Sequence, residues 1–382
     1  MIGLDWTEEQ QRFRQAVVEF AQGDLAKELE RAPESGLPLE AWRRCAEFGL
    51  QGLPVPPDYG GIGADATTIA LALEALGYGC RDSGFIFALS AQLWACETPL
   101  VSFGSERQKR RYLPGLCDGS IKAGHAMSEP DSGSDAFSLR TTATERGGRY
   151  VLNGTKTFVT NAPDADLFVV FATTDRALRF AGLCSFLVER DTPGLAVGQP
   201  LTKMGLKSAP MAELFLDDCE VDAEQLLGGP GAGMAVFNAS MQWERGYILA
   251  GAVGTMQRQL DRCIAYARER RQFDQPIGGF QAVAHRIVDM KVRLETARLL
   301  LYRFAALMDR GEATTLDSAL TKLHLSESFL ASSLDGLQIH GGYGYMSEYE
   351  LEQEVRDAVG GRIYSGTSEV QRNLIARQLG LP

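Results

Sequence analysis

The chain has 382 residues, of which 45% are hydrophobic and 23% charged, and its formal net charge is -11. This composition is typical of a globular protein with two or three domains, and it excludes a disordered, collagen-like or coiled-coil chain. The acidic balance argues against a nucleic-acid-binding protein, which usually carries a basic patch or stripe.

The cysteines and histidines form no metal or disulfide pattern. The 7 cysteines include no CxxC pair and their number is odd, which predicts reduced, mostly buried thiols. The 4 histidines form no HExxH pair, so we expect no metal site. The N-terminus lacks the basic and apolar regions of a signal peptide, and no run of about 18 apolar residues predicts a membrane span. We therefore expect a cytoplasmic protein.

The first third of the chain, residues 1–120, predicts a helical domain. Thr7 and Gln10 form a capping-box pattern, and apolar residues then recur at helical spacing. Further helices are predicted at Leu39–Phe48, Thr67–Leu76 and Phe85–Val101. A glycine-rich stretch at residues 59–63 follows prolines rather than a strand, so we interpret it as a turn and not as a phosphate-binding loop.

The middle of the chain, residues 121–230, predicts a small antiparallel β domain. Asn153-Gly154 between two apolar runs is a hairpin signal, because this pair suits a type I′ turn. Several short strands then follow without intervening helices. Further strands are predicted at Leu167–Ala172, Cys184–Val188 and Ala212–Leu216.

The last part, residues 231–382, predicts a helical bundle. Apolar residues from Val283 to Met308 recur in steps of three and four, which is typical of a long core-facing helix, and leucines from Leu316 to Leu337 indicate another. The fold class is therefore α+β, with an N-terminal α-helical domain, a central antiparallel β domain and a C-terminal α-helical bundle.

Four segments are richer in glycine and specific polar residues than packing requires. They are Met127-Ser-Glu-Pro-Asp-Ser-Gly-Ser-Asp135, Lys156-Thr-Phe-Val-Thr-Asn161, Arg270-Arg-Gln-Phe273, and Gln338-Ile-His-Gly-Gly342 followed by Ile363-Tyr-Ser-Gly-Thr-Ser-Glu-Val-Gln371. Together, and in this order, they resemble the acyl-CoA dehydrogenase family over nearly the whole chain. The resemblance also includes Gly104-Ser-Glu-Arg-Gln-Lys-Arg-Arg-Tyr-Leu-Pro114.

The resemblance implies FAD between the β domain and the C-terminal bundle, and a thioester that loses hydrogen from its α and β carbons. Met127, Ser128 and Ser134 match positions along the pyrimidine edge of the flavin, and Ser134 also matches a substrate contact. Phe158 matches an aromatic residue against the flavin, and Thr160 matches a hydroxyl on its N5 side. The alternative for Thr160 is an ordinary strand threonine.

The adenosine and pyrophosphate end of FAD has its own matches. Arg270 and Phe273 match a pair that contacts the FAD of a neighbouring subunit, and the planar fork of arginine suits a pyrophosphate. The resemblance therefore implies at least a homodimer, often a homotetramer. The other residues that match this end are Gln281, Gln338, Gly341, Gly342 and Thr367.

The catalytic base departs from the usual family pattern. Many members have a glutamate where this chain has Ser365, and a serine hydroxyl cannot accept a carbon-bound proton at neutral pH without a base of its own. Glu244, followed by Arg245, occupies a second base position known from the isovaleryl- and long-chain-type branches. Burial is expected to raise the pKa of Glu244, which suits a general base. The alternative is that Glu244 forms an ion pair with Arg245 or with another cation.

The resemblance implies a mechanism that keeps a role for Ser365. The α-hydrogen of a thioester becomes acidic when donors bond the carbonyl oxygen. In the family these donors are a backbone N–H at the position of Ser365 and the flavin ribityl hydroxyl. Glu244 would take the α-proton, and the β-hydride would move to the flavin. The usual electron acceptor of the family is an electron-transfer flavoprotein.

The Trp243-Glu-Arg245 triplet and Ser365-Gly-Thr-Ser368 resemble a biosynthetic branch that acts on thioesters of acyl or peptidyl carrier proteins. Trp243 is a candidate for closing the substrate pocket, although core packing explains a tryptophan equally well. Three alternatives stay open: a short or branched-chain acyl-CoA dehydrogenase of catabolism, a flavin-dependent oxidase or monooxygenase, and a flavoprotein without catalysis.

A carrier protein is acidic, so an enzyme of net charge -11 needs a local basic patch to bind one. The sequence offers one basic run, with a solvated helix face as the alternative interpretation. This run consists of Arg107, Lys109, Arg110 and Arg111.

Overall fold

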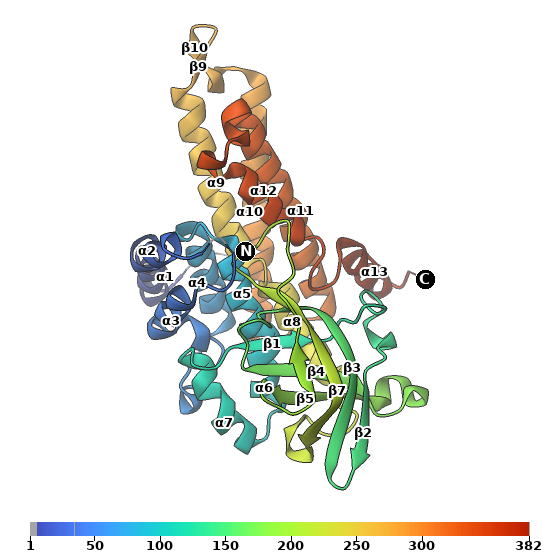
Figure 1. The fold of residues 1–382 in the computed structure, drawn as a ribbon. Coiled ribbons are helices and arrows are strands. Elements are labelled where there is room, and N and C mark those ends of the chain that lie inside the picture. Colours follow the sequence, from blue (N-terminus) through green and yellow to red (C-terminus); the bar gives the residue numbers. More distant parts are fainter. Residues whose placement is uncertain (1–5, 34, 382) are drawn as a thin grey trace.

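A computed structural model describes residues 6–33 and 35–381. It contains an N-terminal group of helices, a central sheet and a C-terminal bundle whose long helices project away from the rest (Figure 1). The N-terminal helices are α1 (Glu8–Phe20), α2 (Ala26–Glu30), α3 (Leu39–Phe48), α4 (Ala66–Gly79), α5 (Ser83–Gln92), α6 (Thr98–Phe103) and α7 (Glu106–Cys117).

Helix α1 begins as the sequence predicts. Thr7 Oγ1 accepts a hydrogen bond from the Gln10 N–H, and the Gln10 side chain accepts one from the Thr7 N–H. The helix predicted at Phe85–Val101 is one continuous element in which a π-helical turn, η4 (Leu93–Glu97), joins α5 to α6. Such π-turns are often found at functional sites. Ala95 of this turn lines a large cavity between the sheet and the C-terminal bundle.

The segment Ser83–Phe103 is long and apolar enough to cross a membrane, with a mean hydropathy of 1.2 over its most apolar stretch. That stretch is 89% buried inside the protein. Trp94 and Phe85 of this segment are fully buried and belong to the main hydrophobic core. The segment therefore packs as a core helix in this fold.

The central sheet has the order β6-β7-β3-β2-β4-β5-β8. Most neighbouring strands are antiparallel, as predicted, but β1 and β2 each pair with β4 in parallel. The strands are β1 (Ala123–Ala126), β2 (Thr142–Arg146), β3 (Arg149–Thr160), β4 (Leu167–Thr173), β5 (Leu183–Glu189), β6 (Leu195–Val197), β7 (Met211–Asp222) and β8 (Leu226–Leu227).

The hairpin predicted at Asn153-Gly154 is wrong. The turn lies at Gly147-Gly148, between β2 and β3, where φ is 58° and 81° and a type I′ turn requires positive values at both positions. Asn153 and Gly154 lie inside β3, at a bulge against β7. A Cβ at Gly154 would lie 2.4 Å from Thr141 Oγ1, so a close neighbour explains the glycine.

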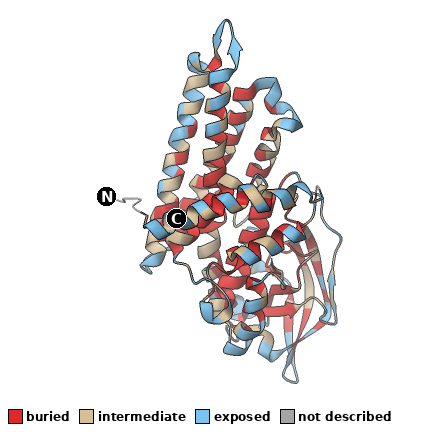
Figure 2. Ribbon diagram, turned by 90° about the vertical axis from the view of Figure 1, so that its left-hand side faces the viewer, coloured by how far each residue is buried: buried red, intermediate tan, exposed pale blue. Residues whose placement is uncertain are grey.

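The C-terminal bundle is built from α8 (Gly233–Tyr247), α9 (Ala250–Glu269), α10 (Gln281–Asp309), α11 (Thr315–His340), α12 (Leu351–Gly360) and α13 (Ser368–Gln378). A short hairpin of β9 (Arg271–Gln272) and β10 (Gln275–Pro276) lies at the tip of α9 and α10 (Figure 1). This tip is exposed, whereas buried residues fill the contacts between the helices and the sheet (Figure 2). All seven cysteines are free and buried, as predicted.

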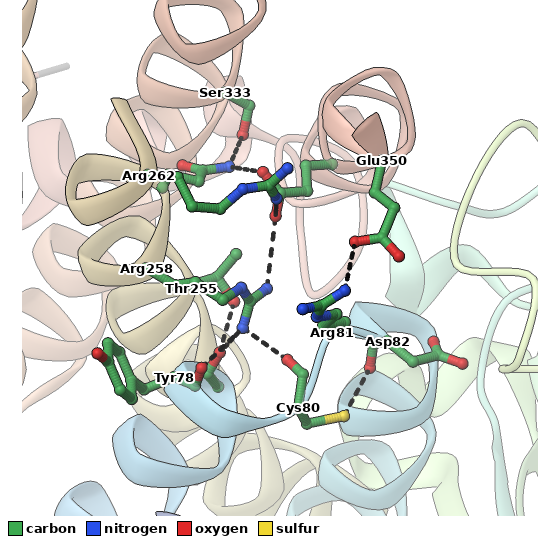
Figure 3. Close-up of polar contacts among 12 residues, drawn as sticks. Tyr78, Cys80, Arg81, Asp82, Thr255, Arg258, Arg262, Ser333 and Glu350 are labelled. Atoms are coloured by element: carbon green, nitrogen blue, oxygen red, sulfur yellow. Dashed lines mark hydrogen bonds and ion pairs between the residues drawn. The ribbon is translucent and has the colours of Figure 1, made fainter. Parts of the chain in front are cut away.

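Arg258 joins the N-terminal helices to the bundle. Its Nη1 donates to the backbone oxygens of Tyr78 at 3.0 Å and Cys80 at 2.7 Å, and its Nη2 reaches Glu354 Oε1 at 3.5 Å. The Glu354 carboxylate also accepts a hydrogen bond from Gln259, which is bonded to Ser333. Figure 3 shows this network between the end of α4 and helices α9, α11 and α12.

We predict that Arg258→Met lowers the free energy of unfolding by about 3 kcal/mol. Several backbone carbonyls lose their donor, and within the described structure the buried Glu354 carboxylate keeps only Arg262, at 3.6 Å, as a cation. Chemical denaturation of the variant measures the loss. Arg12→Met is the control, since Arg12 is 79% exposed and pairs with Glu8 alone among the described residues, and it should change the value by less than about 0.5 kcal/mol. An equal loss in both variants would contradict the assignment.

Candidate active site

A cavity of about 1460 Å³ lies between the sheet and the C-terminal bundle. Four parts of the chain meet there: the segment between β1 and β2, the end of β3, helix α8, and the segment that joins α12 to α13. The sequence-predicted residues that line it are Met127, Ser128, Ser134, Phe158, Thr160, Glu244, Arg245, Ser365 and Thr367.

A buried ion pair holds the segment between β1 and β2 against the end of β3. Lys156 Nζ lies 2.7 Å from Glu129 Oε1, and it also donates to the Met127 carbonyl at 3.3 Å. The Glu129 carboxylate accepts a further hydrogen bond from the Thr141 N–H at 3.0 Å. Burial lowers the pKa of Lys156 to about 8. Sequence reasoning missed this pair, although both charges stand inside quoted segments.

Strand β3 ends in unusual backbone geometry. Phe158 has a φ of 57° and Asn161 a φ of 67°, both in the left-handed region that non-glycine residues rarely adopt. The Phe158 side chain is 64% exposed and lines the cavity. Strain of this kind is typical of functional sites. A flat ring system that covered Phe158 would bury apolar surface that water otherwise contacts.

Glu244 lies near the end of α8, and its Oε1 accepts a hydrogen bond from Ser365 Oγ at 2.5 Å. Burial raises the pKa of Glu244, while the Ser365 hydroxyl, Arg245 and Lys322 act in the opposite direction. The net pKa is above the usual value of a glutamate. No ion pair joins Glu244 to Arg245 among the described residues, and Arg245 Nε is buried without a hydrogen bond there.

The segment that carries Ser365 is held from two sides. Lys322 Nζ donates to the Gly366 carbonyl at 2.7 Å, and Gln371 Nε2 donates to the carbonyls of Ser365 and Gly366 at 3.1 and 2.8 Å. Ser365 has a φ of 56°. Within the described part of the chain, no hydrogen bond uses its N–H. This donor therefore remains available at the cavity wall, beside Glu244.

Lys322 was not predicted, since sequence reasoning assigned its helix to packing. It is fully buried on α11, and burial followed by the charge of Arg245 lowers its pKa to about 8. A lysine between Leu320 and Leu323, inside an apolar stripe, is the signal that could have found it.

His125 also lines the cavity and is a second titratable group to weigh as a base. Its pKa is lowered to about 4, mainly by burial and next by the charge of Lys156. A group of such low basicity is a poor proton acceptor at neutral pH, whereas a glutamate of raised pKa is a good one. Glu244 is therefore the better candidate.

Trp243 does not line this cavity in the described structure. Its ring stacks on Trp94 with centroids 5.8 Å apart, and it also packs against Tyr247. The geometry favours the packing interpretation that the sequence left open. Trp243 supports the helix that presents Glu244, because it stands directly before it on α8.

A second cavity, of about 720 Å³, lies at the exposed tip of the bundle. Arg270, Phe273, Gly341 and Gly342 line it. The Arg270 guanidinium lies 5.5 Å from the Tyr343 ring centroid, and Phe273 is 87% exposed. A Cβ on Gly341 or Gly342 would meet nothing within 4 Å, so open space adjoins the backbone there.

Two further predicted residues, Gln281 and Gln338, are exposed and lie next to the second cavity rather than in its lining. Gln281 begins α10, and Gln338 stands in the last turn of α11. Their assignment to the cofactor remains a prediction.

The two cavities lie far apart in one chain. Helix α9 connects them and has 20 residues, which corresponds to about 30 Å. Figure 1 shows the β9–β10 tip at the opposite end of the molecule from the sheet. Residues that the sequence assigns to one cofactor are thus divided between two places.

The residues present fit FAD in two halves. Phe158 offers an apolar face for a flat ring. Thr367 is the N-cap of α13, an 11-residue helix whose N-terminus faces the first cavity and favours phosphate. Arg270 offers a cation for phosphate beside exposed aromatic rings at the second cavity. Each half is suited to one end of the dinucleotide.

The chain is similar to known proteins over nearly its whole length. The chain matches the family models of the N-terminal, middle and C-terminal domains of acyl-CoA dehydrogenase at residues 7–120, 124–219 and 231–380. It is 46% identical over 341 residues to an L-prolyl-[peptidyl-carrier protein] dehydrogenase of Pseudomonas fluorescens, covering 89% of this chain and 90% of that one.

Two solved structures are also similar. The prolyl acyl carrier protein oxidase AnaB has a TM-score of 0.97 and 49% identity, with 99% of this chain and 100% of that chain covered. PigA with FAD and proline has a TM-score of 0.96 and 39% identity, with both chains covered completely.

Proposed function

The chain belongs to the acyl-CoA dehydrogenase family, and we propose that it oxidises a prolyl thioester carried by a peptidyl or acyl carrier protein. The enzyme is an FAD-dependent oxidoreductase that acts on CH–CH groups. The observation that carries the proposal is the half-buried Glu244 carboxylate, bonded to Ser365 inside the main cavity. The names of two similar proteins specify a prolyl group, and we propose the same acyl group for this chain.

Each residue of the site has a distinct task. Glu244 accepts the α-proton of the thioester at its carboxylate. The N–H of Ser365 donates to the thioester carbonyl oxygen, where negative charge develops during proton removal. Arg245 and Lys322 favour the ionised carboxylate before the proton moves. FAD, when bound, supplies the acceptor for the second hydrogen.

The Ser365 hydroxyl tunes the base. We predict that Ser365→Ala moves the acidic limb of the kcat/KM pH profile to higher pH, because loss of a bond to the carboxylate raises the pKa of Glu244. The control is Ser240→Ala on the same helix, whose buried hydroxyl bonds the Phe237 carbonyl and should leave the profile in place. A profile of Ser365→Ala that coincided with the wild type would contradict this role.

We further propose that the active enzyme is a homodimer or homotetramer. The Arg270 half of the cofactor site lies about 30 Å along α9 from the Glu244 half, so one FAD requires residues of two chains if both halves serve it. Domain boundaries near residues 120 and 230 and a cytoplasmic location complete the proposal.

The function is tested by anaerobic mixing of the FAD-loaded enzyme with prolyl thioesters. We expect the flavin absorbance to bleach and the carrier-bound product to lose two hydrogen atoms by mass spectrometry. The same acyl group on CoA and butyryl-CoA are the comparison substrates, and both should react more slowly. Faster bleaching with butyryl-CoA than with any prolyl thioester would favour the catabolic alternative.

The electron acceptor is a separate question. An electron-transfer flavoprotein is the family default, and oxygen is the second candidate because the similar protein AnaB is named an oxidase. The bleached enzyme is mixed with oxygen or with an artificial acceptor, and the return of the flavin absorbance is measured. Rapid return with oxygen indicates an oxidase, whereas return with the artificial acceptor alone indicates a dehydrogenase.

A further inference from the structure

The main cavity is strongly basic, although the chain as a whole is acidic. Among the described residues that line it, seven are arginine or lysine, and two, Asp135 and Glu244, are carboxylic acids. The chain has a net charge of -11. A lining of this sign attracts an anionic ligand or partner.

Several of these cations have tasks inside the fold. Lys203 donates to the backbone carbonyls of Leu206 and Ala209, and Arg356 bonds Glu352. Arg245 lies within the cavity beside Glu244. The positive charge at the rim of the cavity therefore comes from four exposed residues, Arg140, Arg176, Arg179 and Arg377.

Three of these arginines gather around one short segment, η6 (Arg176–Gly182), between β4 and β5. Arg176 Nη2 donates to the Arg140 carbonyl at 2.8 Å, which joins this segment to the one before β2. Arg140 pairs with Asp131 on the surface. The Asp175 carboxylate at the start of η6 accepts a hydrogen bond from the Ala177 N–H. Among the described residues, no carboxylate forms an ion pair with Arg176 or Arg179.

The same segment exposes apolar side chains. Leu178 is 54% exposed and Phe180 is 49% exposed, and Arg179 stands between them with a φ of 51°. Exposed aromatic, apolar and arginine side chains in one patch are typical of protein interfaces. We call Arg176, Leu178, Arg179 and Phe180 the rim patch.

A line of aromatic rings runs from the rim patch to Glu244. Phe180 contacts Phe137 at 5.2 Å between ring centroids, and Phe137 contacts Phe237 at 5.4 Å. Phe237, Met241 and Glu244 follow on one face of α8 and line the cavity. Glu244 follows Phe237 by seven positions along this helix, which is about 10 Å.

This path suits a phosphopantetheine arm. The arm has about thirteen bonds from phosphorus to sulfur and so reaches about 15 Å at the extension per bond of a polypeptide. With its thioester beside Glu244, its phosphate end would lie near Phe137, whose ring contacts Phe180 of the rim patch. The carrier protein, which is acidic, would then contact Arg176 and Arg179.

The sequence-predicted basic run on α7 is a weaker candidate. Arg107 pairs with Glu224, Arg110 with Glu106 and Arg111 with Glu189. None of the four basic residues of that run lines the main cavity in the described structure. Their charges are largely balanced within the chain, so the solvated-face interpretation fits them better.

We propose that the rim patch docks the carrier protein, with Arg176 and Arg179 contacting acidic residues around its arm-bearing serine and Leu178 and Phe180 supplying the apolar contact. This proposal rests on the proposed function, because it takes a carrier-bound thioester as the substrate. It adds the surface that selects the carrier over a free thioester.

The test uses a double variant that carries both Arg176→Glu and Arg179→Glu. It compares this variant with the wild type on three substrates, in which the prolyl group is attached to the carrier protein, to pantetheine or to CoA. We expect KM for the carrier substrate to rise at least tenfold with kcat unchanged, because charge reversal repels an acidic partner. KM for prolyl-pantetheine should stay within twofold. Added salt should raise the wild-type KM for the carrier substrate only.

The matched control is Arg107→Glu with Arg110→Glu on α7, which should leave all three KM values within twofold. An unchanged KM for the carrier substrate in the rim variant would overturn the proposal. An equal rise for prolyl-CoA would also overturn it, because the arginines would then recognise phosphate rather than a protein. An equal rise for prolyl-pantetheine would show that the arginines contact the arm or the acyl group rather than the carrier protein, and this would overturn the proposal as well.

The wild type separates the two levels of the argument. Oxidation of prolyl-pantetheine without any oxidation of the carrier substrate would overturn the docking surface and leave the oxidation chemistry standing. Failure to oxidise all three thioesters would overturn the proposed function itself, and the docking surface with it.

Discussion

Glu244→Gln is expected to lower kcat for thioester oxidation by about 10²- to 10⁴-fold, the range that a positioned general base contributes. The amide keeps the size of the side chain and can still accept from Ser365, but it cannot take a proton from carbon. FAD content, measured by absorbance, should stay the same. Neither His125, whose pKa is about 4, nor Ser365 replaces the lost base.

Glu97→Gln is the matched control for this loss. Glu97 is also a glutamate of raised pKa, which burial brings to about 8, but it lies in η4 outside the cavity lining. Its amide variant should keep the wild-type rate. An equal fall in both variants would show that buried charge, and not proton transfer by Glu244, limits the reaction.

Activity is expected to return when two inactive variants are expressed together. Arg270→Glu should weaken FAD binding by placing a negative charge where the pyrophosphate is expected, and Glu244→Gln removes the base. In a mixed dimer, one site receives the intact Glu244 of one chain and the intact Arg270 of the other. That site should work, so the mixed dimer should have about half the activity of the wild type.

Co-expression with two different affinity tags allows the mixed dimer to be purified and its rate and FAD content measured. Each variant expressed alone is the control and should be nearly inactive. If the mixed dimer were as inactive as its parents, both halves of the cofactor site would have to come from one chain. The separation of the two cavities along α9 would then need another explanation.

Local patterns in the sequence predicted local structure well. The capping box at Thr7 and the helix at Leu39–Phe48 are present as predicted, because they depend on residues a few positions apart. The Asn153-Gly154 turn failed for the opposite reason. Its glycine is required by Thr141, a neighbour that only the folded sheet brings close.

The candidate site shows the same contrast between local patterns and contacts over long sequence separations. The family motifs predicted which segments line the main cavity, but not the ion pair of Lys156 with Glu129 or the support that Lys322 gives to the Ser365 segment. These charges act across long sequence separations, and their partners are fixed by tertiary packing. The basic run on α7 was misleading because its acidic partners, Glu189 and Glu224, are distant in sequence.

Exchange of the α-hydrogen in D₂O tests most directly whether Glu244 is the base. The enzyme is first reduced chemically, so that it cannot accept a second hydrogen, and is then mixed with the carrier-bound prolyl thioester. The wild type should place one deuterium at the α-carbon, measured by mass spectrometry of the carrier arm, and Glu244→Gln should exchange no faster than the carrier alone. Exchange by Glu244→Gln at the wild-type rate would contradict the assignment of the base.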